Sequence, residues 1–145
     1  MKAWVVDASV AAKWLLPAAG EDFVPAANRL LDLHVRREVQ LLAPAFIWAE
    51  IGNILWKAIR GNRIAQSHAE DSLAQFRDLE LKVVPSEDLM ARALEIATTF
   101  DRTFYDSLYV ALALRVKGEL ITADERLANA LASRFPVRWL GAFHE

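Results

Sequence analysis

Four acidic side chains occupy positions from which carboxylates could act together in chemistry. Asp7 ends the apolar run AWVVD, and Asp124 follows the apolar run ELIT. Asp106 lies near the start of the apolar stretch TFYDSLYVALAL, and Glu50 lies within the longer stretch PAFIWAEIGNILWKAIRGN. Oxygen ligands of this kind suit Mg²⁺ or Mn²⁺ rather than zinc. If the fold brings these acids together, they could hold a divalent ion through which an enzyme reaches a phosphate group.

Three of the four acids also have a purely structural interpretation. Thr103 followed by Asp106 fits a capping box, and an acid in the first helical turn suits the positive end of the helix dipole. Asp7 and Asp124 could each cap the helix that follows the strand before it. These interpretations do not exclude the chemical one, so the residue types leave both open at these positions.

Glu50 is harder to explain as an ordinary surface acid. The central apolar stripe of its helix consists of Ile47, Ile51, Ile54 and Ala58. Glu50 falls at the edge of this stripe, whereas Arg60 lies on the opposite side, where surface charges are usual. Burying a lone carboxylate is costly, so an acid at a core boundary needs a partner, a proton or a metal. Pairing with Lys57 or an arginine is the structural alternative.

Short apolar runs alternate with helical stretches along the whole chain. We expect strands at residues 3–7, 39–43, 81–85, 119–122 and 137–140. We expect helices at residues 8–16, 21–37, 44–62, 65–79, 86–100, 103–114 and 124–133, with Pro44 and Ser86 at the starts of two of them. The strands are continuously apolar, which predicts an α/β domain, a three-layer α/β/α sandwich with a central parallel sheet. Such sheets bind ligands beyond the carboxyl ends of their strands, where Asp7 and Asp124 are expected.

Composition excludes several classes of protein. The 145 residues suit a single domain spanning residues 1–145, and 54% of them are hydrophobic, so a full core is expected. A net charge of −2 argues against a general electrostatic nucleic-acid binder. The chain has no cysteine, and its longest stretch without a polar side chain is residues 41–49, too short to span a membrane. The first residues lack the pattern of a signal peptide, so we expect a cytoplasmic protein.

Other catalytic patterns are absent from the sequence. His34, His68 and His144 are scattered, and we interpret them as surface or boundary residues. The chain contains no GxSxG, P-loop or GxGxxG motif. A haloacid-dehalogenase-type phosphatase would need a second aspartate two residues after Asp7, where Ser9 stands. A receiver-like domain would need an adjacent acid pair and a late-strand lysine, and the sequence offers neither.

Four segments resemble a known family in their order along the chain. VVDASV, AEIGNIL, YDSLYVALAL and LITADERL are similar to the motifs of PIN-domain nucleases, most closely the VapC-type toxins of toxin–antitoxin pairs. The resemblance covers essentially the whole chain. Asp7, Glu50, Asp106 and Asp124 fall on the four acidic positions of the family motif, and Ser9 falls on its small polar position. The resemblance implies a PIN-like fold, Mg²⁺-dependent cleavage of RNA and neutralisation by a cognate antitoxin protein.

On this resemblance we assign a role to each site residue. Asp7 and Asp106 would bind the metal directly, and Glu50 and Asp124 would bind a second ion or hold water at the metal. Ser9 would orient a water molecule or a carboxylate oxygen, or would simply begin a helix. The products should carry 5′-phosphate and 3′-hydroxyl ends, because water rather than the 2′-hydroxyl attacks. Candidates for guiding the RNA backbone are Lys13, Lys57, Arg60, Arg63, Arg102 and Arg126.

Aromatic and apolar residues outside the core stripe predict a partner. On the helix of Glu50 these are Trp48, Gly52, Trp56 and Ile59, and Trp14 adds a further ring on a short helix. Exposed apolar patches mark interfaces, so we expect a homodimer with an apolar groove for an antitoxin helix. Tyr105 and Tyr109 flank Asp106, and we expect them to pack in the core. A catalytically silent PIN-like protein-binding module is the alternative function.

Overall fold

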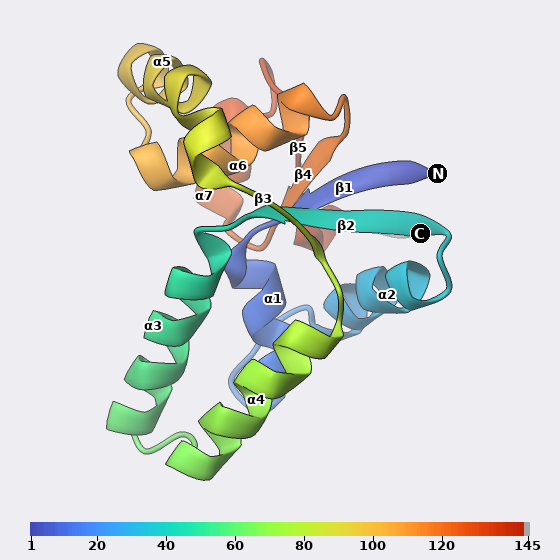
Figure 1. Cartoon of the computed structure of the whole chain (residues 1–145), viewed down its shortest axis with the longest axis vertical. Helices are drawn as coiled ribbons and strands as arrows, with labels where there is room; N and C mark the ends of the chain where they lie inside the picture. Colours follow the sequence, from blue (N-terminus) through green and yellow to red (C-terminus); the bar gives the residue numbers. More distant parts are fainter. Residues whose placement is uncertain (144–145) are drawn as a thin grey trace.

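The computed structural model describes residues 1–143, which fold around a five-stranded parallel sheet of order β3-β2-β1-β4-β5 (Figure 1). The strands are β1 (Lys2–Val6), β2 (Val39–Pro44), β3 (Lys82–Val84), β4 (Glu119–Thr122) and β5 (Val137–Trp139). The central strand β1 pairs with β2 on one side and β4 on the other, with Val5 opposite Leu42 and Val6 opposite Ile121. The expected parallel sheet is confirmed, and every expected strand is present.

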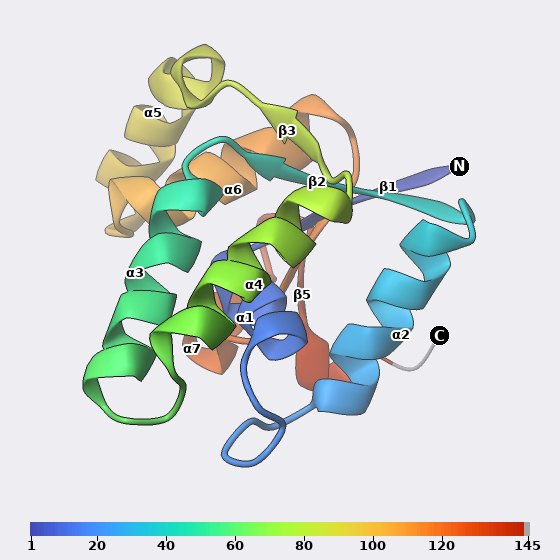
Figure 2. The same ribbon diagram turned by 60° about the horizontal axis from the view of Figure 1, so that its bottom comes forward.

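Helices cover both faces of the sheet and confirm the three-layer α/β/α architecture. They are α1 (Ala8–Leu15), α2 (Val24–Val35), α3 (Ile47–Arg60), α4 (Gln66–Asp78), α5 (Met90–Phe100), α6 (Phe104–Arg115) and α7 (Glu125–Leu131), with short 3₁₀ helices η1 (Ser86–Leu89) and η2 (Leu140–Ala142). Figures 1 and 2 show α5 and α6 on one side of the sheet and α1 and α2 on the other, with α3 and α4 side by side. Within residues 1–143, no helix is both long enough and apolar enough to cross a membrane.

Successive side chains of a strand point to opposite faces of the sheet, and each face packs into its own hydrophobic core. On β1, Val5 joins the larger core with α3, α5 and α6, whereas its neighbours Trp4 and Val6 join a smaller core with α2. Trp4 is 1% exposed and meets Phe143 edge to face, with ring centroids 5.5 Å apart. Because both faces are buried, each strand is apolar at nearly every position, which is the pattern that the sequence showed.

Three helix starts differ from the sequence prediction. Pro44 was expected to begin a helix, but it is the last residue of β2, and α3 begins at Ile47. Ser86 was expected to cap its own helix; its hydroxyl instead accepts a hydrogen bond from the Phe46 N–H at 2.9 Å, and a 3₁₀ turn precedes α5. The helix expected from residue 21 begins at Val24, because the residue before it adopts a left-handed conformation with φ of 59°.

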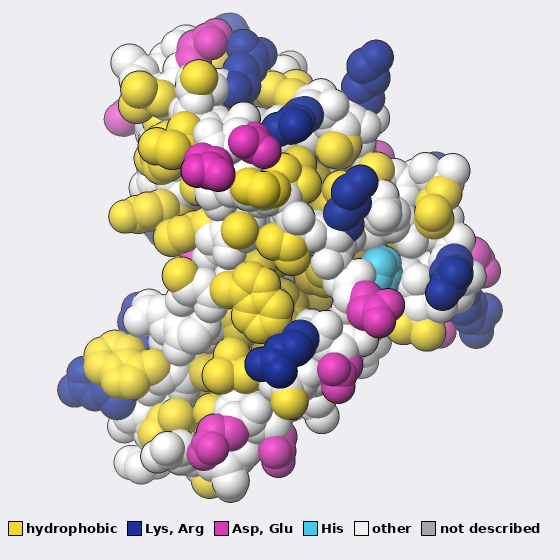
Figure 3. Space-filling view, in the orientation of Figure 1, with side chains coloured by type: hydrophobic (Ala, Val, Ile, Leu, Met, Phe, Trp, Pro, Cys, Tyr) yellow, Lys and Arg dark blue, Asp and Glu magenta, His cyan; other side chains and the backbone are white. Residues whose placement is uncertain are grey.

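The apolar surface predicted on α3 is mostly covered. Trp48 packs edge to face on Phe76 of α4 at 4.8 Å, and the Trp14 Nε1–H donates to the Ala27 carbonyl at 2.8 Å. Gly52 and Ile59 are also partly buried. Of these five residues on α3 and α1, only Trp56 is exposed, so the exposure expected from the sequence is wrong for the other four, while the partner interface itself stays a prediction. Exposed apolar side chains gather instead over α5 and α6 (Figure 3), where they include Met90, Leu94 and Tyr105.

Candidate active site

Asp7 and Asp124 lie at the carboxyl ends of two adjacent strands, as the sequence predicted. Asp7 follows β1 and caps α1, accepting the Val10 N–H on Oδ1 at 3.2 Å. Asp124 follows β4 and caps α7, accepting the Leu127 N–H on Oδ1 at 3.2 Å. Since β1 and β4 pair directly, the two caps are brought to the same edge of the sheet. Each acid therefore has a structural role and a position suitable for chemistry.

Two hydroxyl groups hold the Asp7 carboxylate between the strands. Ser9 Oγ donates to Asp7 Oδ1 and Thr122 Oγ1 donates to Asp7 Oδ2, each at 2.5 Å. Both hydroxyls are themselves fixed, because Ser9 accepts the Ala123 N–H and Thr122 accepts the Asp124 N–H, each at 3.0 Å. Ser9 thus orients a carboxylate oxygen, one of the two chemical roles expected for it. The network fixes the direction in which Asp7 presents its remaining lone pairs.

Asp106 lies in the first turn of α6, half-buried and next to its cap. Thr103 is the N-cap residue, and its hydroxyl accepts the Asp106 N–H at 3.0 Å. The Thr103 half of the predicted capping box is therefore confirmed. It uses the backbone N–H of Asp106, which leaves a role for the carboxylate open.

Glu50 is half-buried on α3, and its partner is a tyrosine rather than the lysine considered from the sequence. The Tyr109 hydroxyl donates to Glu50 Oε1. The buried stripe of α3 is also slightly rotated from the expected one, with Leu55 buried in place of Ile54. This rotation keeps Glu50 at the core boundary, facing α6. A carboxylate at a core boundary thus has the hydrogen-bond partner that its burial demands.

Burial and like charge destabilise the ionised form of Asp7. Asp7 is 9% exposed, and burial raises its pKa from 3.8 to about 6. Hydrogen bonds from Ser9, Thr122 and Val10 oppose this rise, and the charge of Asp106 adds to it. A buried carboxylate with a raised pKa and a like-charged neighbour is typical of functional sites.

The other acids show the same coupling. Burial raises the pKa of Glu50, the Tyr109 hydrogen bond opposes this rise, and the charges of Asp7 and Asp106 add to it. Burial also raises the pKa of Asp106, and the charge of Asp124 adds to this rise. Each acid therefore lies within the electrostatic field of at least one other. The structure brings all four sequence-predicted acids together at one edge of the sheet.

The arrangement and the sequence match one known family. The sequence model for the PIN domain matches residues 4–131. The chain belongs to the PIN domain family. Ribonuclease VapC3 from Pyrobaculum aerophilum is 32% identical over 128 residues, which are 86% of this chain and 92% of that protein. Ribonuclease VapC9 from Mycobacterium tuberculosis is 31% identical over 133 residues, 92% of this chain and 94% of that protein.

Solved structures with low sequence identity share the fold. VapBC2 from Rickettsia felis, bound to a DNA fragment from its promoter, superimposes with a TM-score of 0.68 at 11% identity, covering 94% of this chain and 98% of that one. Mycobacterium tuberculosis VapC20, described as a toxin that cleaves the sarcin–ricin loop, gives a TM-score of 0.65 at 18% identity, covering 91% and 95%. The VapC relatives at 31–32% identity confirm the resemblance found in the sequence motifs over most of the chain.

Two hydroxyl residues of this PIN domain were not predicted as part of the site. Thr122 ends β4 and binds Asp7 across 115 residues of sequence. Tyr109 lies three residues after Asp106 and binds Glu50, while its body packs in the core as predicted. Helical spacing puts Tyr109 on the same face as Asp106, which is a signal that the sequence did contain. Burial, and then the charge of Glu50, raises the pKa of Tyr109, so its hydroxyl remains a donor.

The donor set of the site fits Mg²⁺ in an open arrangement. Among residues 1–143, no three acidic or histidine side chains are close enough to enclose a metal ion. Mg²⁺ does not need such a cage, because it keeps several waters and commonly takes only one or two carboxylates from the protein. The like-charged carboxylates also repel one another, and a divalent cation would relieve that repulsion.

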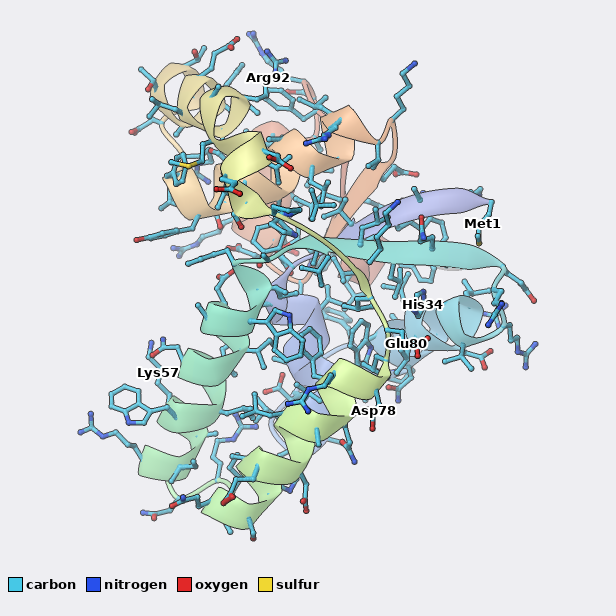
Figure 4. All side chains as sticks on the ribbon, viewed as in Figure 1. Met1, His34, Lys57, Asp78, Glu80 and Arg92 are labelled. Carbon is cyan, nitrogen blue, oxygen red and sulfur yellow. The ribbon has the colours of Figure 1, made fainter. Side chains whose placement is uncertain are left out.

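Few of the basic residues considered for RNA contact are available near the acids. Lys13, with 9% side-chain exposure, and Arg63 both pair with Glu21, at 3.4 and 3.2 Å. Arg102 is the exception, since its charge lowers the pKa of Asp106. Lys57, Arg60 and Arg126 are exposed, and Figure 4 shows Lys57 on the outer side of α3. Arg102 is therefore the best-placed basic residue for a phosphate at this site.

The two histidines that the structure describes lie outside the site, as expected. His34 Nδ1 accepts the Leu41 N–H at 3.1 Å, and its Nε2 lies 3.0 Å from the Leu79 carbonyl. It lines a cavity with Met1, Asp78 and Glu80 at the amino ends of the strands, opposite the acids (Figure 4). His68 lies 2.9 Å from the Leu15 carbonyl, and His144 lies outside the described residues.

Proposed function

We propose that this PIN domain is a Mg²⁺-dependent endoribonuclease, the toxin component of a toxin–antitoxin pair. The observation that carries the proposal is the convergence of four carboxylates from four separate segments at one edge of the sheet. Ribonuclease relatives of the VapC type, matched over nearly their whole length, support RNA as the substrate. Mn²⁺ should substitute for Mg²⁺, because both ions take oxygen ligands.

The proposed mechanism assigns each acid a task. Asp7 and Asp106 would hold the ion, and Asp124 would complete the negative site from the end of β4. Mg²⁺ bound there would supply positive charge to the scissile phosphate and make water more acidic. Glu50 accepts the Tyr109 hydroxyl on Oε1, so its Oε2 is free to orient the attacking water and take its proton. A raised pKa makes Glu50 a better base for this transfer at neutral pH.

The leaving group and the products follow from water as nucleophile. Water attacks phosphorus, the bond to the 3′-oxygen breaks, and that oxygen takes a proton from solvent water to leave as the 3′-hydroxyl, while Glu50 returns its proton to solvent. The new 5′ end keeps the phosphate. Arg102 is positioned to neutralise charge on the phosphate during this step, since its charge already acts on Asp106.

We also propose two protein partners and a place of action. A structure with the same fold from Klebsiella pneumoniae is a toxin–antitoxin complex, which supports a cognate antitoxin as the expected inhibitor. A homodimer would cover exposed apolar residues, of which Met90 and Leu94 lie one turn apart on α5 with 51% and 60% exposure. RNA and antitoxin both occur in the cytoplasm, where we expect the protein to act.

Cleavage of a mixed RNA pool tests the proposal. The purified protein should cut RNA in Mg²⁺ or Mn²⁺, show no cleavage in EDTA, and leave 5′-phosphate ends that a phosphate-dependent exonuclease can degrade. Cleavage that persists in EDTA, or ends that carry a cyclic phosphate, would contradict the metal mechanism. An absence of cleavage with every metal, together with tight binding of the antitoxin, would favour the alternative of a silent protein-binding module.

A further inference from the structure

Tyr105 is an aromatic side chain that core packing does not explain. The sequence predicted it to be buried, but it is 56% exposed. Its ring stacks on Phe46 with centroids 4.8 Å apart and planes 7° from parallel. Stacked rings at this distance support each other, and here one of the pair is turned outward. The core prediction for Tyr105 is therefore wrong, and its exposure needs another account.

The stacked pair lies at the beginnings of the helices that carry Glu50 and Asp106. Tyr105 immediately precedes Asp106 at the start of α6. Phe46 precedes α3, and its carbonyl accepts the Glu50 N–H at 3.2 Å, one turn along the helix. The Ser86 hydroxyl accepts the Phe46 N–H and fixes the backbone there. The two rings thus join the beginnings of the helices that carry two of the four carboxylates.

One face of the Tyr105 ring is open. Phe46 covers the opposite face, so an exposure of 56% leaves the outward face accessible to a flat ligand. Nucleobases stack on such faces with useful affinity, whatever their sequence. In duplex RNA the faces of the bases are already covered by their neighbours, so the ligand that fits is an unpaired base.

The charge of the molecule favours stacking as a source of RNA affinity. The net charge is −2, and Lys13 and Arg63 pair with Glu21, so phosphate contacts available near the site are few. A second copy of this chain is a less suitable occupant of the Tyr105 face. A symmetric contact there would bring two clusters of carboxylates toward each other, which like-charge repulsion opposes.

We propose that Tyr105, supported by Phe46, is a stacking platform for one unpaired nucleobase next to the scissile phosphate. This inference rests on the proposed ribonuclease function, to which it adds a residue that contacts the substrate.

The test compares three variants on an RNA hairpin with a loop that the protein cuts. Tyr105→Leu removes the ring but keeps an apolar side chain, and Tyr105→Phe keeps the ring. Trp56→Leu is the matched control, because Trp56 is 50% exposed on α3 and lies ten residues, about 15 Å of helix, beyond Phe46. Steady-state kinetics at saturating Mg²⁺ give kcat and KM separately.

Loss of stacking should appear in KM. We expect Tyr105→Leu to raise KM about tenfold with a smaller change in kcat, Tyr105→Phe to restore most of the affinity, and Trp56→Leu to match wild type. Loop nucleotides are then replaced one at a time by an abasic nucleotide. At one position this replacement should raise the KM of wild type to that of Tyr105→Leu. The same replacement should leave the KM of Tyr105→Leu unchanged. An unchanged KM in Tyr105→Leu would overturn the proposal. A wild-type KM that rises equally for every abasic substrate would overturn it as well.

A binding measurement separates failure of the platform from failure of the function. The same hairpin with 2-aminopurine in its loop is titrated with protein in EDTA, where stacking quenches the fluorescence without cleavage. Quenching by wild type that is lost in Tyr105→Leu supports the platform, even if no metal restores cleavage and the ribonuclease proposal fails. Cleavage by wild type without Tyr105-dependent quenching overturns the platform alone. Dissociation of a dimer by Tyr105→Leu with unchanged RNA affinity would assign the surface to a protein interface and overturn the proposal.

Discussion

Replacement of Asp7 by asparagine should stabilise the metal-free protein. The pKa of Asp7 is raised from 3.8 to about 6, chiefly by burial. The folded chain therefore holds the Asp7 proton more tightly than the unfolded chain, and the free energy of unfolding falls as the pH rises from about 4 to about 6. Above that range the ionised carboxylate destabilises the fold by about 3 kcal/mol at pH 8.

Asparagine removes this penalty but loses part of the hydrogen bonding. Ser9 and Thr122 both donate to the carboxylate, and asparagine offers only one acceptor oxygen. The loss of one such hydrogen bond costs about 1 kcal/mol. The net gain at pH 8 is then about 2 kcal/mol, or about 5–8 °C in Tm for a chain of this size. At pH 5 the charge penalty is about half as large, so most of the advantage should disappear.

Thermal melting in EDTA at pH 8 and pH 5 measures both effects. Asp71→Asn is the matched control, because Asp71 is an exposed acid on α4 away from the site. We expect the control to follow wild type at both pH values, and Asp7→Asn to melt clearly higher at pH 8 but to lose most of that advantage at pH 5. A lower Tm for Asp7→Asn at pH 8, or an advantage that does not change with pH, would refute the reasoning.

Asp106→Asn removes another repelling charge, so this variant should melt at or above the wild-type Tm in EDTA. Mn²⁺ at one hundred times Kd should stabilise wild type by roughly 2.7 kcal/mol and the variant by much less. An equal stabilisation of both proteins would remove Asp106 from the metal site. Tyr109→Phe removes the hydroxyl that donates to Glu50 and should lower kcat about tenfold. Chemical denaturation of this variant should show a loss of stability of only about 1 kcal/mol. An unchanged kcat would mean that the tyrosine is only structural. Gly52→Ala should stabilise α3 by about 1 kcal/mol, since nothing lies within 4 Å of the added methyl group. Gly118→Ala should instead destabilise the protein strongly, because its Cβ would lie 2.1 Å from a backbone oxygen of β1. Chemical denaturation of both variants measures the two changes in stability, and changes of the same sign and size would contradict the packing.

Local pattern was sufficient to predict the sheet and the acids at its edge. Asp7 and Asp124 follow continuously apolar strands, and parallel strands place their carboxyl ends together. Asp106 and its Thr103 cap are three residues apart, within one helical turn. These features depend on neighbours in sequence, so the sequence alone contains them.

Contacts between distant segments could not be predicted in the same way. Thr122 reaches Asp7 across 115 residues and Tyr109 reaches Glu50 across 59, and no local pattern specifies either pair. The exposure of aromatic rings also depends on packing, since α4 covers Trp48. Such pairings are decided by the three-dimensional arrangement of helices that the sequence pattern leaves open.

The rate of RNA cleavage by Asp7→Asn at saturating Mg²⁺ tests the central claim most directly. Because this variant should be at least as stable as wild type at pH 8, a loss of activity cannot arise from unfolding. If the carboxylates hold the metal that cleaves RNA, the rate should fall at least about a hundredfold, or roughly 2.7 kcal/mol of transition-state stabilisation, while Asp71→Asn keeps the wild-type rate. A near-normal rate for Asp7→Asn at saturating Mg²⁺ would contradict the account.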